Sequence, residues 1–256
     1  MEWIDTHAHI YDPVFDTDLS QVLANCQRAK VVKIYLPNID TDTIAPMLAL
    51  EAKDSTLFSS MIGIHPCHIQ QDFVQKLYQV ESWLTKHQFV GIGEIGMDLY
   101  RDRTYEAQQA EAFDIQLMWA RAHQLPVVIH TRKSFSQTLR FLERHQDGTL
   151  RGIVHCFSGN LREAQQVIEL GFYVGIGGLV TFKNATLAKT VAQIGLQHIV
   201  LETDSPYLAP GVHRGQRNEP AYLVDIAAQV ATLQGVDLAE VAAATTANAR
   251  AIFERA

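Results

Sequence analysis

Six short segments of this chain place a metal-ligand side chain just past an apolar run that is typical of a β-strand. The segments are Ile4-Asp5-Thr6-His7-Ala8-His9, Gly63-Ile64-His65-Pro66, Gly93-Glu94-Ile95-Gly96-Met97-Asp98, Val127-Val128-Ile129-His130, Ile153-Val154-His155 and Val200-Leu201-Glu202-Thr203-Asp204. His7 and His9 stand one residue apart, so in an extended segment both imidazoles point to the same side and can bind one ion. The mixed imidazole and carboxylate donors predict a site for two divalent ions and are compatible with zinc, manganese or magnesium.

The composition suits one folded unit. At 256 residues, with 47% hydrophobic residues, the chain can bury a large core. Its apolar runs, such as Val31–Leu36 and Pro126–Ile129, are far shorter than a membrane span, and no charged-then-apolar leader is present. Cys26, Cys67 and Cys156 lack paired spacing, which argues against disulfides and against a structural zinc module. We therefore expect a soluble cytoplasmic protein with reduced cysteines and no membrane partner.

The formal net charge of −7 weighs against a protein that grips long duplex DNA through counterion release. The acidic residues fall mainly in helix-like stretches, whereas several basic residues lie in or beside loops that follow strand-like runs. These basic residues are Arg101, Arg103, Arg132, Lys133, Lys183, Arg214 and Arg217. If the loops share one rim, that rim is locally basic on an acidic body; otherwise these are ordinary surface charges.

Short β-rich runs alternate with amphipathic helical stretches along the whole chain. The predicted strands are Glu2–Thr6, Val31–Leu36, Leu57–Ile64, Phe89–Gly93, Val127–His130, Gly152–His155, Phe172–Gly175 and His198–Glu202. The predicted helices are Asp18–Ala29, Thr43–Lys53, Phe73–His87, Tyr105–Gln124, Ser134–His145, Leu161–Leu170, Ala185–Ile194, Tyr222–Leu233 and Leu238–Ala251. This count, with continuous apolar runs that fit parallel strands buried on both faces, predicts a TIM-type (β/α)8 barrel. No linker, repeat or low-complexity tract divides the sequence, so we predict a single α/β domain over residues 1–256.

Active sites on this barrel form at the C-terminal ends of the strands and in the loops that follow them. The candidate ligands His7, His9, His65, Glu94, His130, His155 and Asp204 all stand at such positions. A single buried histidine is more often a hydrogen-bonded core residue than a ligand. Because candidates recur at equivalent strand ends, we expect them to meet on one rim of the barrel.

With these residues in place, the sequence resembles the TatD-type metal-dependent hydrolases, within the amidohydrolase-like barrel superfamily. The segments that carry the resemblance are Asp5-Thr6-His7-Ala8-His9, Gly63-Ile64-His65-Pro66, Gly93-Glu94-Ile95-Gly96-Met97-Asp98, His130, His155-Cys156-Phe157-Ser158-Gly159, Leu201-Glu202-Thr203-Asp204-Ser205-Pro206-Tyr207-Leu208 and Arg217-Asn218-Glu219-Pro220. They occur in order over nearly the whole chain, whereas each alone is a weak signal. One departure is that many relatives have an aromatic residue directly after the aspartate at 98, where this chain has Leu99-Tyr100. That loop is expected to touch substrate, so the change bears on substrate preference.

The resemblance implies a role for each ligand. His7, His9 and Asp204 would bind one ion, His130 and His155 would complete a second site, and Glu94 would bridge both ions. Related barrels often bridge with a carboxylated lysine, whereas here the fourth strand supplies a carboxylate directly.

Two ions about 3.5–4 Å apart can share a bridging water and lower its pKa. We expect the resulting hydroxide to attack a phosphodiester phosphorus, with Asp204 orienting it and taking its proton. His65 would contact the substrate phosphate or the leaving oxygen, helped by Arg217. Asp98 and Glu202 are expected to fix loops or orient ligands, and Asp98 is also a candidate for substrate contact.

Two cysteines lie close to candidate site residues. Cys67 follows His65 by two residues and Cys156 follows His155 directly. A thiolate ligand is conceivable, but buried cysteine usually acts as a small apolar residue, which is the interpretation we favour.

The favoured function is a metal-dependent deoxyribonuclease of the TatD type that acts as an exonuclease on DNA ends, with single strands preferred because low net basicity suits short contacts. The first alternative is hydrolysis of a carboxylic ester or amide, such as removal of an aminoacyl group from tRNA, since the same hydroxide can attack a carbonyl. A metal-binding partner protein without turnover is the third. The sequence does not distinguish a monomer from a homo-oligomer.

Overall fold

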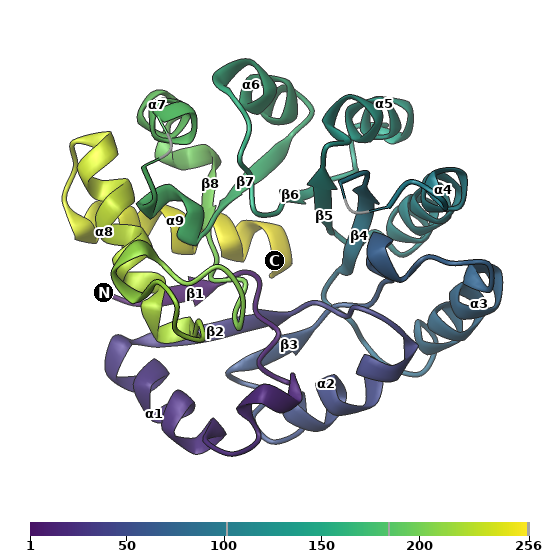
Figure 1. The fold of residues 1–256 in the computed structure, drawn as a ribbon, viewed down its shortest axis with the longest axis horizontal. Coiled ribbons are helices and arrows are strands. Elements are labelled where there is room, and N and C mark those ends of the chain that lie inside the picture. The colour runs from purple at the N-terminus through teal and green to yellow at the C-terminus, as the bar shows by residue number, and fades with distance from the viewer. Residues whose placement is uncertain (101, 184, 255–256) are drawn as a thin grey trace.

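The chain folds into a ring of parallel strands surrounded by helices (Figure 1). The computed structural model describes residues 1–100, 102–183 and 185–254. In these ranges the strands are β1 (Trp3–Asp5), β2 (Val31–Leu36), β3 (Phe58–Ser60), β4 (Ile92–Asp98), β5 (Val127–Arg132), β6 (Gly152–Val154), β7 (Phe172–Ile176) and β8 (Ile199–Leu201). The α-helices are α1 (Leu19–Ala29), α2 (Ile44–Glu51), α3 (Phe73–Trp83), α4 (Glu106–His123), α5 (Phe135–His145), α6 (Leu161–Glu169), α7 (Ala185–Gln193), α8 (Leu223–Gln234) and α9 (Leu238–Phe253). Each strand is followed by a helix, as the sequence predicts; the predicted basic loop residue Arg101 lies outside the described residues.

Two sets of contacts close the ring. Parallel pairing runs through β1-β2-β3 and through β4-β5-β6-β7-β8. An isolated parallel bridge between Ile62 and Ile92 joins the two groups on one side. On the other side the Thr6 amide donates to the Leu201 carbonyl at 3.0 Å, so β8 meets β1. The prediction of a TIM-type α/β barrel is confirmed.

Apolar side chains fill the N-terminal end of the barrel interior. This buried cluster combines inward-facing strand residues with residues from the end of α9, and it comprises Ile4, Tyr35, Met61, Val128, Ile153, Val200, Ala249, Ile252 and Phe253. The rings of Tyr35 and Phe253 stack with centroids 3.9 Å apart, so α9 closes this end. Because side chains alternate along a strand, the inward residue two positions after Val128 is His130, and after Ile153 it is His155. The inward-facing histidines therefore lie towards the other end of the barrel interior.

Strand β4 departs from the predicted boundaries. The prediction ended this strand at Gly93, whereas β4 spans Ile92–Asp98 and carries Glu94 inside it. Its register against β5 shifts between Ile92 and Ile95, and the Gly93–Glu94 peptide bond is cis. The glycines do not end the strand: Gly96 has a φ of 132° and lies against the His130 backbone, where a Cβ would overlap the carbonyl oxygen.

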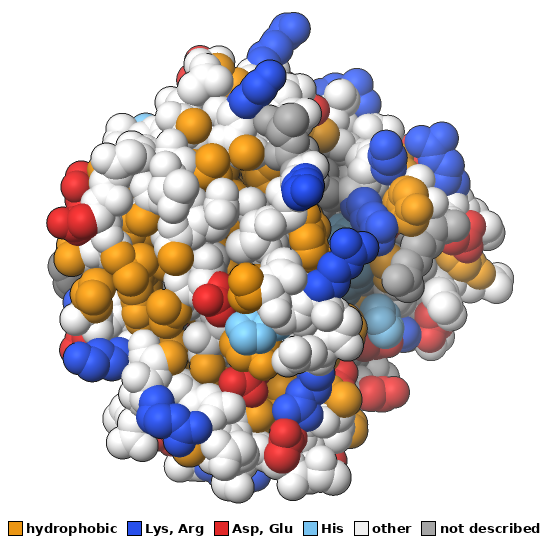
Figure 2. Space-filling view, turned by 60° about the vertical axis from the view of Figure 1, so that its left-hand side comes forward, with side chains coloured by type: hydrophobic (Ala, Val, Ile, Leu, Met, Phe, Trp, Pro, Cys, Tyr) orange, Lys and Arg blue, Asp and Glu red, His pale blue; other side chains and the backbone are white. Residues whose placement is uncertain are grey.

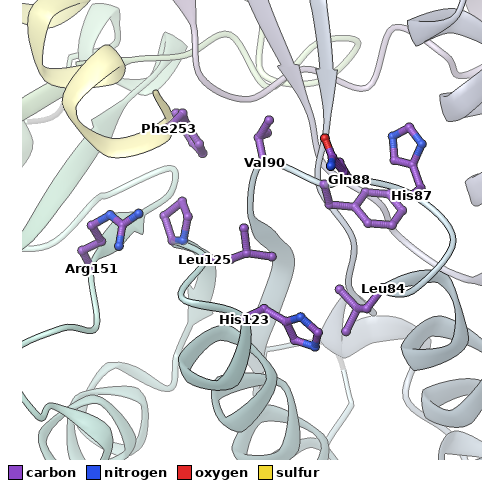
Figure 3. A pocket seen from close by; sticks show the side chains of 10 residues that line it. Leu84, His87, Gln88, Val90, His123, Leu125, Arg151 and Phe253 are labelled. Atoms are coloured by element: carbon purple, nitrogen blue, oxygen red, sulfur yellow. The ribbon is translucent and has the colours of Figure 1, made fainter. Parts of the chain in front are cut away.

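A cavity of about 520 Å³ lies at the opposite end of the barrel from the candidate ligands (Figure 3). It is formed by segments that precede β4, β5 and β6 and by the end of α9, and its lining includes Leu84, Val90, Leu125, Arg151 and Phe253. Barrel active sites form at the other end, so this cavity is not the catalytic site. Among the described residues, none of the helices is long and apolar enough to cross a membrane.

Asp40 fixes the loop that leads to His65. Its carboxylate accepts hydrogen bonds from Lys76 Nζ at 2.7 Å and from the Thr41 amide at 2.7 Å, and its Oδ2 lies 3.1 Å from His68 Nδ1. The neighbouring Ile39 carbonyl accepts from the His65 amide at 2.8 Å. Burial alone would raise the pKa of Asp40, but the hydrogen bonds from His68 and Lys76 outweigh it and hold that pKa well below its usual range.

We expect Asp40→Ala to lower the free energy of unfolding by about 2 kcal/mol at neutral pH, since it removes a helix cap and charge-assisted hydrogen bonds. A carboxyl whose pKa is lower in the folded than in the unfolded protein stabilises the fold fully at any pH above its unfolded-state pKa, here 3.8. This stabilisation is lost as the pH falls towards the pKa of the folded state. The difference from wild type should therefore shrink at about pH 3. Urea unfolding at both pH values tests this, with Asp42→Ala in the same turn as control. Equal effects of the two substitutions, or no change with pH, would contradict it.

Candidate metal centre

Glu94 lies at the centre of a buried cluster at the C-terminal ends of the strands. Its Oε2 is 3.2 Å from His7 Nε2 and 3.7 Å from His9 Nε2. The two imidazole nitrogens are 3.1 Å apart, as their spacing in the sequence predicts. Asp204 Oδ1 approaches the same pair, 3.7 Å from His7 Nε2 and 3.5 Å from His9 Nε2.

The second oxygen of Glu94 faces three further histidines. Its Oε1 lies 2.9 Å from His130 Nδ1, 3.4 Å from His65 Nε2 and 3.6 Å from His155 Nε2. One carboxylate thus contacts side chains from the loops or strands β1, β3, β5 and β6. Every residue predicted as a ligand is brought into this one cluster.

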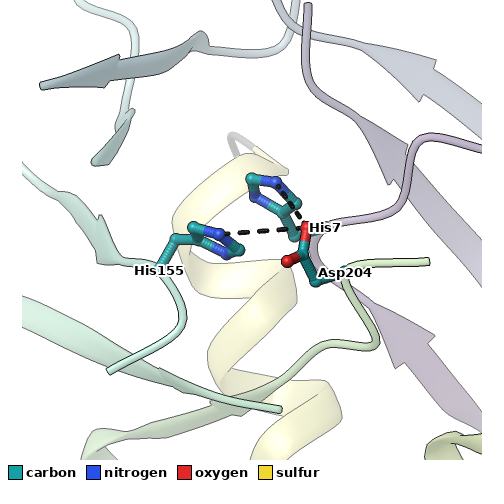
Figure 4. Close-up of side chains that lie close together, drawn as sticks. All are labelled: His7, His155 and Asp204. Atoms are coloured by element: carbon teal, nitrogen blue, oxygen red, sulfur yellow. Dashed lines mark ion pairs between the residues drawn. The ribbon is translucent and has the colours of Figure 1, made fainter. Parts of the chain in front are cut away.

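Asp204 reaches the cluster from the loop after β8. Its φ of 58° places it in the left-handed region, which aspartate tolerates better than most residues, and its amide donates to the His7 carbonyl at 2.8 Å. Figure 4 shows the Asp204 carboxylate facing the imidazoles of His7 and His155. These two rings stack with centroids 3.5 Å apart.

Tyr11 contacts the nitrogen of His9 that faces away from the cluster. The Tyr11 hydroxyl donates to the Pro37 carbonyl at 2.6 Å and lies 3.1 Å from His9 Nδ1. Because the hydroxyl proton is used on Pro37, the hydroxyl oxygen must accept from His9 Nδ1–H. The neutral ring then directs the lone pair of Nε2 into the cluster. Tyr11 was not predicted as a site residue, although its position two residues after His9 continues the alternation of His7 and His9.

Asp98 and Glu202 perform the same task for two other histidines. Asp98 Oδ2 lies 3.0 Å from His130 Nε2, and Glu202 Oε1 lies 3.0 Å from His155 Nδ1. Asp98 is hydrogen-bonded to the outer nitrogen of His130 and Glu202 forms an ion pair with the outer nitrogen of His155, so in each ring the inner nitrogen is the one that can bind a ligand. Gly175 makes room for the Glu202 carboxylate, which a Cβ at that position would overlap.

His65 is oriented in the opposite sense. Its Nδ1 accepts from the Cys67 amide at 3.1 Å, so Nδ1 carries a lone pair and the neutral ring bears its proton on Nε2, the nitrogen that faces Glu94. Burial lowers the pKa of His65 to about 4, so the ring is neutral at pH 7. His65 therefore presents an N–H to the cluster where His9 presents a lone pair.

Imidazoles of the cluster carry protons at the positions where metal ions could bind. Burial and the neighbouring His155 lower the pKa of His7. Although burial opposes it, the nearby Glu202 and Glu94 raise the pKa of His155 to about 10. The surrounding histidines likewise overcome burial and hold the pKa of Glu94 well below its usual range. A charged carboxylate set compensated by protonated imidazoles is what a divalent ion would replace, with release of those protons.

The donor set fits divalent metal ions. Within the described residues, four groups have all their donor atoms within 4.8 Å of one another: His7, His9 and Glu94; His7, His155 and Asp204; His65, Glu94 and His130; and His155, Cys156 and Glu202. Imidazole nitrogens combined with carboxylate oxygens suit zinc and manganese, and outer partners such as Asp98 and Glu202 are the usual companions of metal-bound histidines.

The remaining predicted residues lie around the cluster. Arg217 donates two hydrogen bonds to the Asp18 carboxylate, at 2.9 and 2.7 Å, and one to the Val14 carbonyl, so its expected substrate contact remains a prediction. Cys67 is exposed and acts through its amide on His65. Burial raises the pKa of the Cys156 thiol well above its usual value, so it is protonated at neutral pH.

This arrangement agrees with the comparison to known families. A family model described as TatD related DNase matches residues 4–254. The chain belongs to the TatD-related DNase family. It is a metal-dependent hydrolase, and the resemblance drawn from the sequence motifs is confirmed.

Similar TatD-family proteins cover the whole barrel. The uncharacterized metal-dependent hydrolase YabD of Bacillus subtilis is 33% identical over 250 residues, which are 97% of this chain and 98% of YabD. The uncharacterized metal-dependent hydrolase YjjV of Escherichia coli K12 is 32% identical over 254 residues, 98% of this chain and 97% of YjjV. The crystal structure of YjjV superposes with a TM-score of 0.93 at 30% identity, covering 99% and 98% of the two chains. The phosphotriesterase homology protein of E. coli, crystallised with phosphate in its active site, shares the fold, with a TM-score of 0.73, 15% identity and 99% coverage of both chains.

We predict that Glu202→Gln lowers the pKa of His155 in the metal-free protein from about 10 towards the usual value, because the anion beside Nδ1 is lost. NMR titration of the imidazole nitrogens measures this directly. In the same titration His65 should protonate only near pH 4 in both proteins. Asp225→Asn, which removes the partner of the surface residue His213, is the matched control and should leave His155 unchanged. An unaltered His155 in Glu202→Gln would show that Glu202 does not hold its proton.

Proposed function

We propose that this protein hydrolyses phosphodiester bonds at DNA ends, preferring single strands, with two divalent ions in the cluster around Glu94. The observation that carries the proposal is the difference in orientation among the histidines. His9, His130 and His155 turn a nitrogen inward while an outer partner holds the other nitrogen, whereas His65 turns an N–H inward. A site whose inner nitrogens can bind metal once their protons are released, with one N–H of His65 directed inward, suits metal binding beside a leaving oxygen.

The proposed ligands divide between the two oxygens of Glu94. His7, His9 and Asp204 would hold one ion, and His130 and His155 the other, with Glu94 shared. When bound, the ions would supply the positive charge that lowers the pKa of an attacking water and offsets charge on the phosphoryl oxygens. The outer hydrogen bonds of Tyr11, Asp98 and Glu202 would keep the imidazoles in position during that change.

Asp204 would accept a proton, and His65 would donate a hydrogen bond. Asp204 has a lowered pKa because interactions with His9 and His155 overcome burial, so it is charged at neutral pH and able to accept a proton from the attacking water. His65 carries its proton on Nε2 and would donate a hydrogen bond from it to the leaving oxygen or to a phosphoryl oxygen, without giving up the proton. Its lowered pKa keeps it neutral in the resting protein.

The surface around the cluster supports an anionic substrate. Figure 2 shows a hollow on one face of the molecule with histidine side chains inside it and Lys and Arg side chains gathered around its edge. The formal net charge is −7, so this local basicity contrasts with the body of the protein. A basic rim on an acidic body favours a short anionic end over a long duplex track. The description of the matching family as a DNase supports DNA as that anion.

We expect the metal-stripped protein to leave end-labelled single-stranded DNA intact and to shorten it stepwise when magnesium, manganese or zinc is added back. Glu94→Ala should abolish the shortening and reduce the bound metal, since it removes the shared carboxylate. Gel analysis of the labelled products and metal analysis of the protein measure both effects. Metal binding without shortening under any ion would reject DNA as substrate and favour carboxylic esters or amides, such as aminoacyl-tRNA.

His65→Gln separates the hydrogen-bond donor from the ligands. This variant should keep its metal content and lose about 10²- to 10³-fold in turnover, the usual range for loss of a hydrogen-bond donor to a developing negative charge. Loss of metal from His65→Gln would instead make His65 a ligand. Full turnover would remove it from the reaction.

A further inference from the structure

An exposed aromatic ring and a guanidinium are stacked on the rim beside the cluster. Tyr100 follows β4 and is 58% exposed. The Arg132 guanidinium, at the end of β5, lies 3.9 Å from the centroid of the Tyr100 ring. The exposure is what remains with Arg132 in place, so much of the ring is still open to solvent.

This pair is tied to the histidine cluster. Asp98 accepts from the Tyr100 amide at 2.9 Å through Oδ1, while its Oδ2 lies 3.0 Å from His130. The Leu99 amide donates to the Arg132 carbonyl at 2.8 Å, which joins the two loops. Arg132 follows His130 by two residues, so both belong to the same side of β5. One carboxylate therefore fixes the position of both His130 and the Tyr100 backbone.

Arg132 is better placed for an anion than Arg217. Arg217 is engaged by both oxygens of Asp18. Among the described residues, by contrast, no carboxylate forms an ion pair with Arg132.

We propose that Tyr100 and Arg132 form a nucleotide-binding subsite beside His130, in which a nucleobase stacks on Tyr100 and Arg132 binds the adjacent phosphate. The proposal rests on the proposed nuclease function and specifies how that site recognises single strands. Aromatic rings that stack on bases, next to cations that meet the backbone, are the general means of binding single strands without sequence preference. A stacked guanidinium keeps N–H groups available for phosphate oxygens. In an intact duplex the bases are already stacked on one another, so they would not be free to stack on Tyr100.

Two oligomers of equal length separate the two contacts. One is labelled oligodeoxythymidylate and the other has the same backbone with abasic spacers; both carry phosphorothioate linkages that resist hydrolysis. Binding to the full-length protein is followed by fluorescence anisotropy. Tyr100→Ala should weaken binding of the thymidylate oligomer at least about fivefold and leave the abasic oligomer unchanged, whereas Tyr100→Phe should retain both affinities. Arg132→Ala should weaken both oligomers and reduce the salt dependence of binding.

Tyr78→Ala, which removes another exposed tyrosine from α3, is the matched control and should change neither affinity. Binding of thymidylate that is insensitive to Tyr100→Ala, while ordinary single-stranded DNA is cleaved, would overturn the subsite and leave the nuclease proposal intact. Tyr100-dependent binding without any cleavage would overturn the nuclease proposal and leave the binding subsite intact. A wild-type protein that neither binds nor cleaves would overturn both.

Discussion

The structure depends on keeping charged groups compensated inside a buried cluster. Glu94 is 3% exposed and contacts five imidazoles, and a buried carboxylate without such partners would cost several kcal/mol. Compensation extends outward, because Tyr11, Asp98 and Glu202 each hold the outer nitrogen of a histidine. These outer groups decide which nitrogen faces inward and so what the site can bind. His65 has the opposite orientation and adds an N–H hydrogen-bond donor to the site.

Two features of the barrel position this cluster: side chains alternate along each strand, and α9 covers the N-terminal end of the barrel. The inward positions near the N-terminal ends of the strands are apolar and covered by α9, and the next inward positions on β5 and β6 are His130 and His155. The bulge in β4 carries Glu94 into the same layer. Loop contacts such as those of Asp40 then set the segments that no strand pairing fixes.

Much of the fold and the candidate ligands could be predicted because both follow local rules. The apolar run Val31–Leu36 matches β2 at both ends, and ligands at strand ends converge in any barrel. The end of β4 was predicted wrongly because of its glycines. In a sequence, a glycine that allows close packing cannot be distinguished from a glycine that ends a strand. Tyr11 was missed because a tyrosine is not itself a ligand type. The pairing of Arg217 with Asp18 and the stacking of Arg132 on Tyr100 join residues from different loops, which no local pattern encodes.

The central claim is that two divalent ions share Glu94. Anomalous diffraction from crystals of the protein loaded with manganese or zinc, collected at the absorption edge of that metal, tests it most directly. The account predicts two anomalous peaks about 3.5–4 Å apart, one on each side of the Glu94 carboxylate, with His65 Nε2 outside the ligands of both. A single peak, peaks away from Glu94, or His65 among the ligands would contradict it.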